Sequence, residues 1–440
     1  MRVIRGCVLS AVFVAMAFAQ DPPAPAGDGN SVSIRSTGVG DSRVGVAVPT
    51  FATPPGQDAL ASQMTEVLRY DLEFTGLIRL LRPEEFPTSF QGLTSDAAQL
   101  DFPSWRNARA EYVVHGYIVS EGGNVALDGR LLDAATGQQV VGRRYPSEQS
   151  AWRLVVHTFA EDIVKYLDGE PGIATSGYCF SGGATGKKEI YIADYDGANL
   201  KQLTQHNSIS ILPTFSPDGL KIAYVSFKDR YQFLYSFELS SGKSTALSKE
   251  VGMNSAPAWA PDGSRLAMVL SKDANSEIYL VNADGTNKKR LTNDGGTDTS
   301  PCFSPDGGNI AFVSDRGGSP QIYVMDTSGG NVRRLSLQGG KSYDPSWSPD
   351  GKQIAYVVEQ GGFEIWVMDA NGSNPRNLTA SGGSNESPSW SRDSRNVVFT
   401  STREGKPQLW TANAATGQNR KVPGISVAAQ GPDWGPRRGR

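Results

Sequence analysis

One short pattern recurs through the second half of the chain at a nearly constant spacing. Its clearest copy is Pro345–Gly351 (PSWSPDG), and the leading prolines of the six copies stand 44, 44, 44, 43 and 44 residues apart. These prolines are Pro213, Pro257, Pro301, Pro345, Pro388 and Pro432. A repeat of roughly 40–45 residues is typical of β-propeller blades, each built from four short strands. The spacing therefore predicts a propeller.

The residues inside one repeat support this interpretation. Ser-Pro-Asp-Gly is a turn sequence, because proline presets φ, aspartate tolerates the third turn position and glycine accepts the exit geometry. In the fourth copy, the apolar run Ile354–Val357 follows the turn, and a second run, Ile365–Trp366, comes after it. Asn371-Gly372 then marks a second turn before Leu378-Thr379. Such β-branched and aromatic runs between turns predict an antiparallel blade of four strands.

The ends of the repeat region predict how the ring closes. Ile190–Asp194 has the spacing of a blade strand, but its blade lacks the opening Pro-x-Trp segment. Pro432–Pro436 supplies such a segment at the other end of the chain. We expect six blades, with the C-terminal segment completing the first one, because closure leaves no unpaired edge to aggregate.

The region before the repeats alternates between strand and helix patterns. Val44–Pro49 has the composition of a strand, and the apolar residues from Leu60 to Leu72 recur at helical spacing. Residues 112–116 and 125–132 are expected to pair about a Gly-Gly turn, and Trp152–Ile163 is a second amphipathic helix. The predicted fold is a small N-terminal α/β domain over residues 32–170, followed by a six-bladed propeller over residues 171–437.

The first residues have the pattern of an export signal. Residues 1–19 combine two arginines, a short apolar run and a small-x-small end, which predicts a signal peptide cleaved near Ala19-Gln20, with a membrane anchor as the alternative. Residues 20–31 lack large apolar side chains and are expected to be disordered. Removing the signal leaves 40 of the 42 basic residues against 45 acidic ones, a net charge of −5. This balance argues against nucleic acid or an anionic membrane as a partner.

The motifs of common catalytic and metal sites are missing from the sequence. There is no Gly-x-Ser-x-Gly nucleophile elbow and no His-Glu-x-x-His or Cys-x-x-Cys pair. His115, His157 and His206 are interpreted as packed or capping residues. We therefore predict no catalytic residues, no metal ligands and no cofactor.

Two recurring residue types invite a functional interpretation but favour a structural one. Aspartates recur with the turn at positions 218, 262, 306, 350 and 393, and each is expected to shape the turn of its own blade rather than to form a carboxylate ring. Cys179 and Cys302 fall in the first and fourth blades, too far apart for a disulfide, which needs Cα atoms within about 7 Å. They are expected to be separate thiols.

The segments between blades vary while the strands repeat, and variation on a rigid scaffold is where recognition usually lies. These expected loops are His206–Leu212, Val251–Ala256, Asp294–Ser300, Gly339–Asp344, Ser381–Ser387 and Ser426–Gly431.

The region before the repeats carries a more specific pattern, which resembles the TolB family, the periplasmic propeller proteins of the Tol–Pal envelope system. The residues that carry the resemblance are Val46–Pro49, Asp71–Gly76, Trp105, Tyr112–Gly116, Leu131–Asp133, Arg153 with His157, and Asp162–Gly172. The resemblance runs from about Val32 to Arg437.

The resemblance implies a non-enzymatic, monomeric periplasmic scaffold without a membrane span. It would bind the peptidoglycan-associated lipoprotein Pal through one propeller face and the inner-membrane protein TolA through its N-terminus. The implied role is outer-membrane invagination and integrity during cell division. A propeller-based peptidase or glycan hydrolase, and a scaffold for some other envelope protein, are the alternatives.

The resemblance also implies contact residues. By position, the Pal contacts fall on Met253, Asn254, Ala256, Thr299 and Ser300, in loops of adjacent blades. The TolA contacts fall on Val32, Ser33, Ile34 and Arg35. Here residues 20–30 precede that segment, which departs from the family pattern, where it lies at the extreme mature N-terminus.

Overall fold

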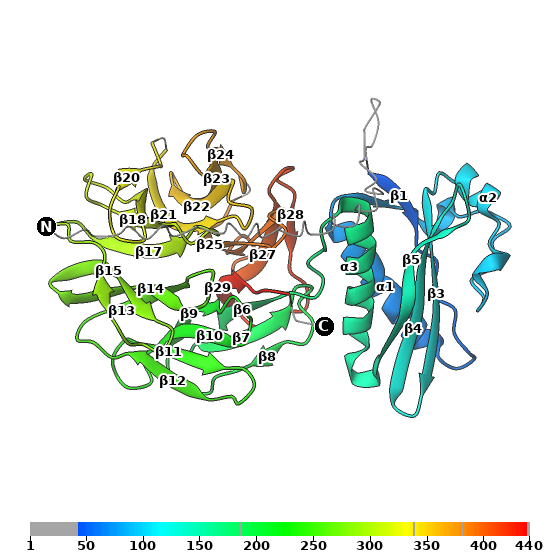
Figure 1. Cartoon of the computed structure of the whole chain (residues 1–440), viewed down its shortest axis with the longest axis horizontal. Coiled ribbons are helices and arrows are strands. Elements are labelled where there is room, and N and C mark those ends of the chain that lie inside the picture. The colour runs from blue at the N-terminus through cyan, green and yellow to red at the C-terminus, as the bar shows by residue number, and fades with distance from the viewer. Residues whose placement is uncertain (1–42, 185, 338, 381, 438–440) are drawn as a thin grey trace, which may run out of the picture.

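Two domains follow one another along the chain (Figure 1). The computed structural model describes residues 43–437 apart from residues 185, 338 and 381. The predicted signal peptide, the predicted disordered segment at 20–31 and the predicted TolA contacts Val32, Ser33, Ile34 and Arg35 lie outside the described residues.

The N-terminal domain is a five-stranded sheet with the strand order β2-β1-β3-β4-β5. Its strands are β1 (Val44–Ala47), β2 (Ile78–Leu80), β3 (Tyr112–Glu121), β4 (Asn124–Asp133) and β5 (Gln139–Glu148). β1 pairs in parallel with β2 and β3, and the other pairs are antiparallel. The predicted pairing of residues 112–116 with 125–132 is confirmed, in the register Val113↔Leu132.

Two long helices cover one face of this sheet (Figure 1). They are α1 (Asp58–Phe74) and α3 (Trp152–Asp168), and both predicted helices are confirmed. α3 ends because Gly169 adopts a left-handed conformation with φ 88° and its N–H bonds Lys165 O, as a helix C-terminus requires. The other face packs against α2 (Phe102–Asn107), which contributes the buried Trp105. Three short 3₁₀ helices complete the domain, at Pro83–Glu85, Ala97–Gln99 and Gln149–Ala151.

The predicted propeller is confirmed, with six four-stranded antiparallel blades in the described residues. The first blade is β29 (Ala429–Trp434), β6 (Gly177–Gly182), β7 (Glu189–Asp194) and β8 (Lys201–Gln202). The next two are β9 (Ser210–Phe215), β10 (Lys221–Ser226), β11 (Phe233–Glu238) and β12 (Ser244–Ser248), then β13 (Asn254–Trp259), β14 (Arg265–Asp273), β15 (Asn275–Asn282) and β16 (Lys289–Arg290).

The last three blades repeat the same order from the innermost strand outward. They are β17 (Asp298–Phe303), β18 (Asn309–Ser314), β19 (Gln321–Asp326) and β20 (Arg333–Arg334); β21 (Lys341–Trp347), β22 (Gln353–Glu359), β23 (Phe363–Asp369) and β24 (Arg376–Asn377); and β25 (Asn385–Trp390), β26 (Asn396–Ser401), β27 (Gln408–Asn413) and β28 (Asn419–Lys421).

The C-terminal strand closes the ring, as predicted. β29 pairs antiparallel with β6, with Ala429 opposite Gly182 and Trp434 opposite Tyr178. The last strand of the described residues is therefore the innermost strand of the first blade. Closure gives β6 a partner on both edges, which removes a strand edge that would otherwise be open.

The recurring aspartates shape their own turns, as predicted. Asp306 Oδ1 accepts hydrogen bonds from Ser304 Oγ and from the N–H of Gly308, all within one turn. Equivalent bonds form at Asp218, Asp350 and Asp393. In the third blade, alanine replaces the serine, and Ser264 Oγ donates to Asp262 instead. These carboxylates are used within their turns and do not form a shared site.

The N-terminal domain packs on the propeller end that carries these turns. Asp168 at the end of α3 forms an ion pair with Arg395, two residues after Asp393 of the sixth-blade turn. The rings of Phe74 on α1 and Trp434 on β29 lie 6.4 Å apart, and one apolar core runs through both domains. We call this end of the propeller the turn face, and the opposite end the rim face.

Cys179 and Cys302 are separate free thiols, as predicted. Burial raises the pKa of both, for Cys302 to about 11. Among the helices of the described residues, none combines the length and apolar composition that crossing a bilayer needs.

Candidate functional site

The predicted contact residues lie at the rim-face ends of the innermost strands of two neighbouring blades. The expectation that all of them belong to loops is wrong, because Asn254 and Ala256 are part of β13, and Thr299 and Ser300 are part of β17. Only Met253 precedes its strand. The same holds for the ends of the other expected inter-blade loops, since each innermost strand begins before the proline.

Asn254 is a buried structural residue of this edge. Its side chain is 0% exposed. Its Oδ1 accepts hydrogen bonds from Ser248 Oγ at 2.7 Å and from the N–H of Glu250 at 3.1 Å. Its Nδ2 donates to the carbonyls of Gln232, Glu250 and Gly252. The amide therefore fastens the loop before β13 to the strand, and it cannot present itself to a partner without breaking these bonds.

Other blades place a polar residue at the same position. Asp298 at the start of β17 forms an ion pair with Arg316 at 2.7 Å, and Asn385 at the start of β25 accepts a hydrogen bond from Arg403 at 3.0 Å. Buried polar groups need such partners, because an unsatisfied one costs roughly 1–3 kcal/mol. In these three blades, the polar residue at this position therefore helps to hold the rim together.

Ala256 and Ser300 lie at a bulge that recurs in every blade. The residue before each blade-opening proline has a positive φ, from 46° at Ala256 and Asp344 to 58° at Gly431. The full set is Leu212, Ala256, Ser300, Asp344, Ser387 and Gly431. Each innermost strand shifts its register at this point, as a β-bulge does. Because proline has no N–H to give to the ladder, a bulge is where a strand tolerates it.

These bulges line the central channel. The channel holds a cavity of about 510 Å³ bounded by the innermost strands, and both polar and apolar groups line it. Ser300 Oγ donates to Asp344 Oδ1 at 3.0 Å, and burial raises the pKa of Asp344. Asp433 accepts hydrogen bonds from the N–H of Phe215 at 2.8 Å and from Ser389 Oγ at 3.0 Å. Ala256 and Ser300 thus line the channel.

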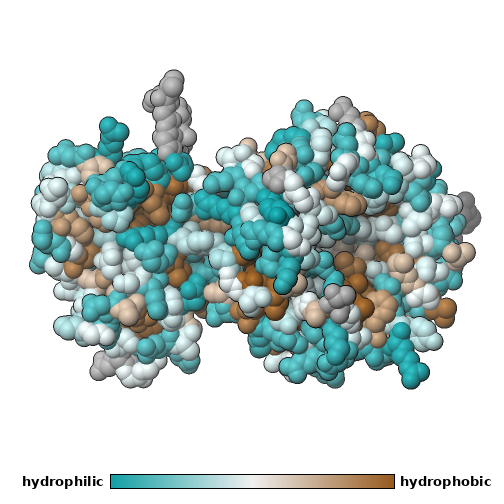
Figure 2. Space-filling model, turned by 180° about the vertical axis from the view of Figure 1, so that it is seen from behind, coloured by the Kyte–Doolittle hydropathy of each residue, from teal (hydrophilic) through white to brown (hydrophobic). Residues whose placement is uncertain are grey.

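The rim face also exposes apolar side chains beside Met253. Met253 is 38% exposed, Val251 is 85% exposed and Tyr231 is 68% exposed. The bond from Asn254 Nδ2 to Gln232 O brings the turn of Tyr231 next to the loop of Val251 and Met253. We call Tyr231, Val251 and Met253 the rim cluster. Figure 2, which views the molecule from behind, shows scattered apolar patches among hydrophilic residues on both domains.

Sequence reasoning placed Val251 in an expected loop but singled out neither it nor Tyr231 as a contact. The available signal was an aromatic and a valine in turn segments, where polar residues are usual. Thr299, on β17, is half-buried and pairs with Val313. The assignment of Met253, Asn254, Ala256, Thr299 and Ser300 to partner binding stays a prediction.

Comparison with known families accounts for both domains. The family described as TolB beta propeller domain matches residues 178–438, and the one described as TolB amino-terminal domain matches residues 32–140. The chain belongs to the TolB family. A protein named TolB homolog from Chlorobium chlorochromatii is 37% identical over 229 residues, which are 52% of this chain and 51% of that protein. The Tol-Pal system protein TolB of Geobacter sulfurreducens is 37% identical over 164 residues, or 37% of each chain.

The match to these curated TolB relatives covers about half of their length or less. The structural match covers a larger share of the chain than these sequence matches do. The crystal structure of TolB from Acinetobacter baumannii superposes with a TM-score of 0.79 at 27% identity, covering 90% of this chain and 97% of that one. The TolB arrangement of a small α/β domain followed by a six-bladed propeller therefore extends over nearly all of this chain.

Proposed function

We propose that the protein is a non-enzymatic periplasmic scaffold of a Tol–Pal system. In this role it binds the Pal lipoprotein through the rim face and an inner-membrane partner, TolA, through residues 32–35. It supports outer-membrane invagination and integrity during cell division. Membership of the TolB family supports the assignment to a Tol–Pal system, and the relative from Geobacter sulfurreducens is named a Tol-Pal system protein.

The rim cluster is the observation that supports the rim face as the Pal-binding surface. Three apolar side chains stand exposed at the end of the propeller that faces away from the N-terminal domain. Buried apolar anchors surrounded by polar groups supply most of the affinity at protein interfaces. Ala256, which lines the channel, follows Met253 of the cluster by three residues.

The histidine environments support the non-enzymatic part of the proposal. The common serine and cysteine hydrolases use a histidine that is hydrogen-bonded to the nucleophile. Instead, His115 Nε2 contacts the Thr94 carbonyl, His157 Nδ1 contacts the Asp71 carboxylate and His206 Nε2 contacts the Tyr224 hydroxyl. A fluorophosphonate probe should leave the protein unlabelled, and covalent labelling of a serine would favour the propeller-based peptidase instead.

Calorimetry with the soluble domain of the same organism's Pal tests the partner and its place. Met253→Arg puts a charge into the rim cluster and should weaken binding by about 2 kcal/mol, roughly thirtyfold. Met253 is partly exposed, so the stability should stay within about 0.5 kcal/mol of the wild type. Thr299→Arg is a second probe, but as a half-buried strand residue it needs its melting curve checked.

Asp284→Arg is the matched control, because Asp284 lies in the β15–β16 turn on the turn face. Its binding should equal that of the wild type. Equal affinity for Met253→Arg and wild type would move the Pal site away from the rim cluster, and no binding of Pal by the wild type would refute the partner. N-terminal sequencing of the exported protein checks cleavage near Ala19-Gln20, and light scattering checks the monomer.

A further inference from the structure

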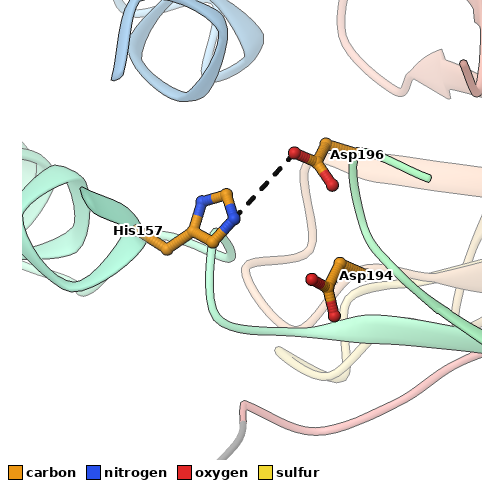
Figure 3. A group of neighbouring side chains, drawn as sticks. All are labelled: His157, Asp194 and Asp196. Atoms are coloured by element: carbon orange, nitrogen blue, oxygen red, sulfur yellow. Dashed lines mark ion pairs between the residues drawn. The ribbon is translucent and has the colours of Figure 1, made fainter. Parts of the chain in front are cut away.

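Two buried imidazole nitrogens among the described residues have no hydrogen-bond partner. One is His157 Nε2, which belongs to a charged group at the domain junction, together with Asp71, Arg153 and Asp196. It faces Asp196 Oδ2 at 3.9 Å, so a proton on this nitrogen gives it an ion-pair partner (Figure 3). The other is His115 Nδ1, whose ring forms no ion pair with the described residues. This nitrogen needs another explanation, because a buried polar atom without a partner is rare.

The hydrogen bond between His115 and Thr94 fixes the tautomer of the imidazole. His115 Nε2 lies 2.9 Å from the carbonyl oxygen of Thr94, and a carbonyl oxygen only accepts, so Nε2 carries a proton. Burial lowers the pKa of His115, which keeps the ring neutral at pH 7. Nδ1 therefore presents a lone pair. Because the residue is only 2% exposed, this lone pair is a buried acceptor without a donor.

His115 lines a cavity of about 240 Å³ in the N-terminal domain. Of the described residues that line it, His115 alone comes from the sheet, on β3, and the others belong to the segment from Pro87 to Trp105. This segment covers the sheet on the side of α2, away from α1 and α3 (Figure 1). His115 thus forms the floor of the cavity. The volume is below the roughly 300–1,000 Å³ of sites for drug-sized molecules, so one small molecule fits.

The wall of the cavity combines apolar side chains with carboxylates. The apolar ones are Phe90, Leu93, Leu100 and Trp105. Asp96 and Asp101 also line it, whereas no lysine or arginine does so among the described residues. Asp96 Oδ1 accepts a hydrogen bond from the N–H of Ala98 at 2.9 Å, and Asp101 Oδ2 accepts one from Ser104 Oγ. The other oxygen of each carboxylate bonds no described residue, so both remain open to a ligand.

Thr94 holds Asp96 near the floor of the cavity. The carbonyl of Thr94 bonds His115, and its Oγ1 accepts a hydrogen bond from the N–H of Asp96 at 3.2 Å. The Asp96 carboxylate is near enough to the ring to oppose the lowering of the His115 pKa. A lone pair and a carboxylate beside apolar walls suit a positively charged donor. An ammonium group has three N–H donors and no acceptor, and aromatic rings attract it.

We propose that this cavity binds the primary ammonium group of a small organic amine. The ammonium donates to His115 Nδ1 and to the Asp96 carboxylate, Asp101 adds a second negative charge, and the apolar stem of the amine packs against Phe90 and Leu100. A free amine and the end of a lysine side chain share this chemistry. The site lies on the side of the N-terminal domain away from the propeller, so it is separate from the proposed Pal site (Figure 1).

The test uses the full chain without residues 1–19 in phosphate buffer at pH 7, where an alkylamine, with a pKa near that of lysine, is protonated. In ¹⁵N NMR spectra, n-butylamine should shift the Nδ1 resonance of His115 in a saturable way and leave those of His157 and His206 unchanged. n-Butanol has the same shape without the charge and should bind at least tenfold more weakly. Nα-acetyl-lysine amide separates the two sources, since its binding would admit a lysine side chain and its failure would restrict the site to free amines.

Asp96→Asn removes the charge but keeps an oxygen for the N–H of Ala98, and it should weaken n-butylamine binding at least tenfold. Asp58→Asn is the matched control, because Asp58 is an exposed aspartate of α1, on the other side of the same sheet, and it should bind like the wild type. Circular dichroism checks that both variants fold. No saturable shift at His115, as expected for a cavity that holds water alone, would overturn the proposal. Equal affinity for n-butanol or glucose, or equal n-butylamine affinity in wild type and Asp96→Asn, would do so as well.

Discussion

The closing strand offers the most direct test of how this propeller is held together. Trp434 is 2% exposed, its ring lies 5.0 Å from that of Tyr178, and its Nε1 donates to Ser176 Oγ at 2.8 Å. Truncating a buried tryptophan to alanine costs roughly 3–5 kcal/mol. At about 2 °C per kcal/mol for a domain of this size, Trp434→Ala should lower the melting temperature by about 6–10 °C.

Deletion of residues 428–440 is the stronger form of the same perturbation. It removes all of β29 and leaves β6 without a neighbour on one edge. All six residues of β6 are buried, so the exposed edge is apolar as well as unpaired. Such an edge pairs with other chains. We expect aggregation, or a melting temperature below that of Trp434→Ala, measured by calorimetry and by light scattering after gel filtration.

Trp347 is the matched control for Trp434. It occupies the same position in the fifth blade, but it is half-buried and its Nε1 bonds Gly351 O within its own blade. Trp347→Ala should therefore cost clearly less than Trp434→Ala. A monomeric deletion variant with an unchanged melting curve, or equal losses for the two tryptophans, would refute the closure argument.

Three further predictions concern single residues. Asn254→Ala should destabilise the propeller by at least about 1–3 kcal/mol in urea unfolding, because Gln232 O and other carbonyls lose their donor. The bond from Ser304 Oγ holds the pKa of Asp306 below its usual value, so its contribution to stability is present above about pH 4 and is lost as the pH falls through the lowered pKa. Urea curves of wild type and Asp306→Asn should accordingly differ at pH 7 and converge near pH 2. Cys302, whose pKa burial raises to about 11, should resist iodoacetamide at pH 8 until the protein unfolds, as followed by mass spectrometry.

The blades could be predicted from sequence because each depends on local signals. A turn of fixed composition, an apolar strand and a closing Leu-Thr or Leu-Ser recur within one period, and each blade repeats the same pairing. Ring closure was also predictable, since the segment missing at one end of the repeats is present at the other. The N-terminal helices could be predicted from the spacing of their apolar residues, because α1 and α3 each bury one apolar face.

Strands at the edge of the N-terminal sheet were missed for a physical reason. β5 (Gln139–Glu148) is the outermost strand, and most of its residues are at least partly exposed. Without a buried face, its sequence lacks the alternation of apolar and polar residues that predicts a strand. It also contains Pro146, which an edge strand tolerates. β2 has only three residues, too few for any periodic signal.

The contact residues were assigned to loops because a bulge conceals the start of each innermost strand. Asn254-Ser255-Ala256-Pro257 contains no alternation, since Ala256 turns to a positive φ and shifts the register before the proline. From its sequence alone, Asn254 is therefore predicted to be a polar loop residue, although it is a buried residue of β13. The pattern of the sequence could place these residues at the end of a blade, but not decide which of them face solvent.

The charged group at the domain junction shows what spacing alone cannot reveal. Arg153 and His157 are four residues apart on α3, so a shared face was predictable. Their partners Asp71 and Asp196 come from other elements and meet them only when the domains dock. No local pattern marks such a meeting point.

The closing strand and the domain junction meet in the same part of the molecule. Within β29, Asp433 bonds both the second and the sixth blades, through Phe215 and Ser389. The next residue, Trp434, contacts Phe74 of α1. One six-residue strand therefore holds the ring shut and supports the docked domain, so the two are energetically linked. Because β29 follows every other blade strand along the chain, the ring cannot close around its channel until this strand has been synthesised.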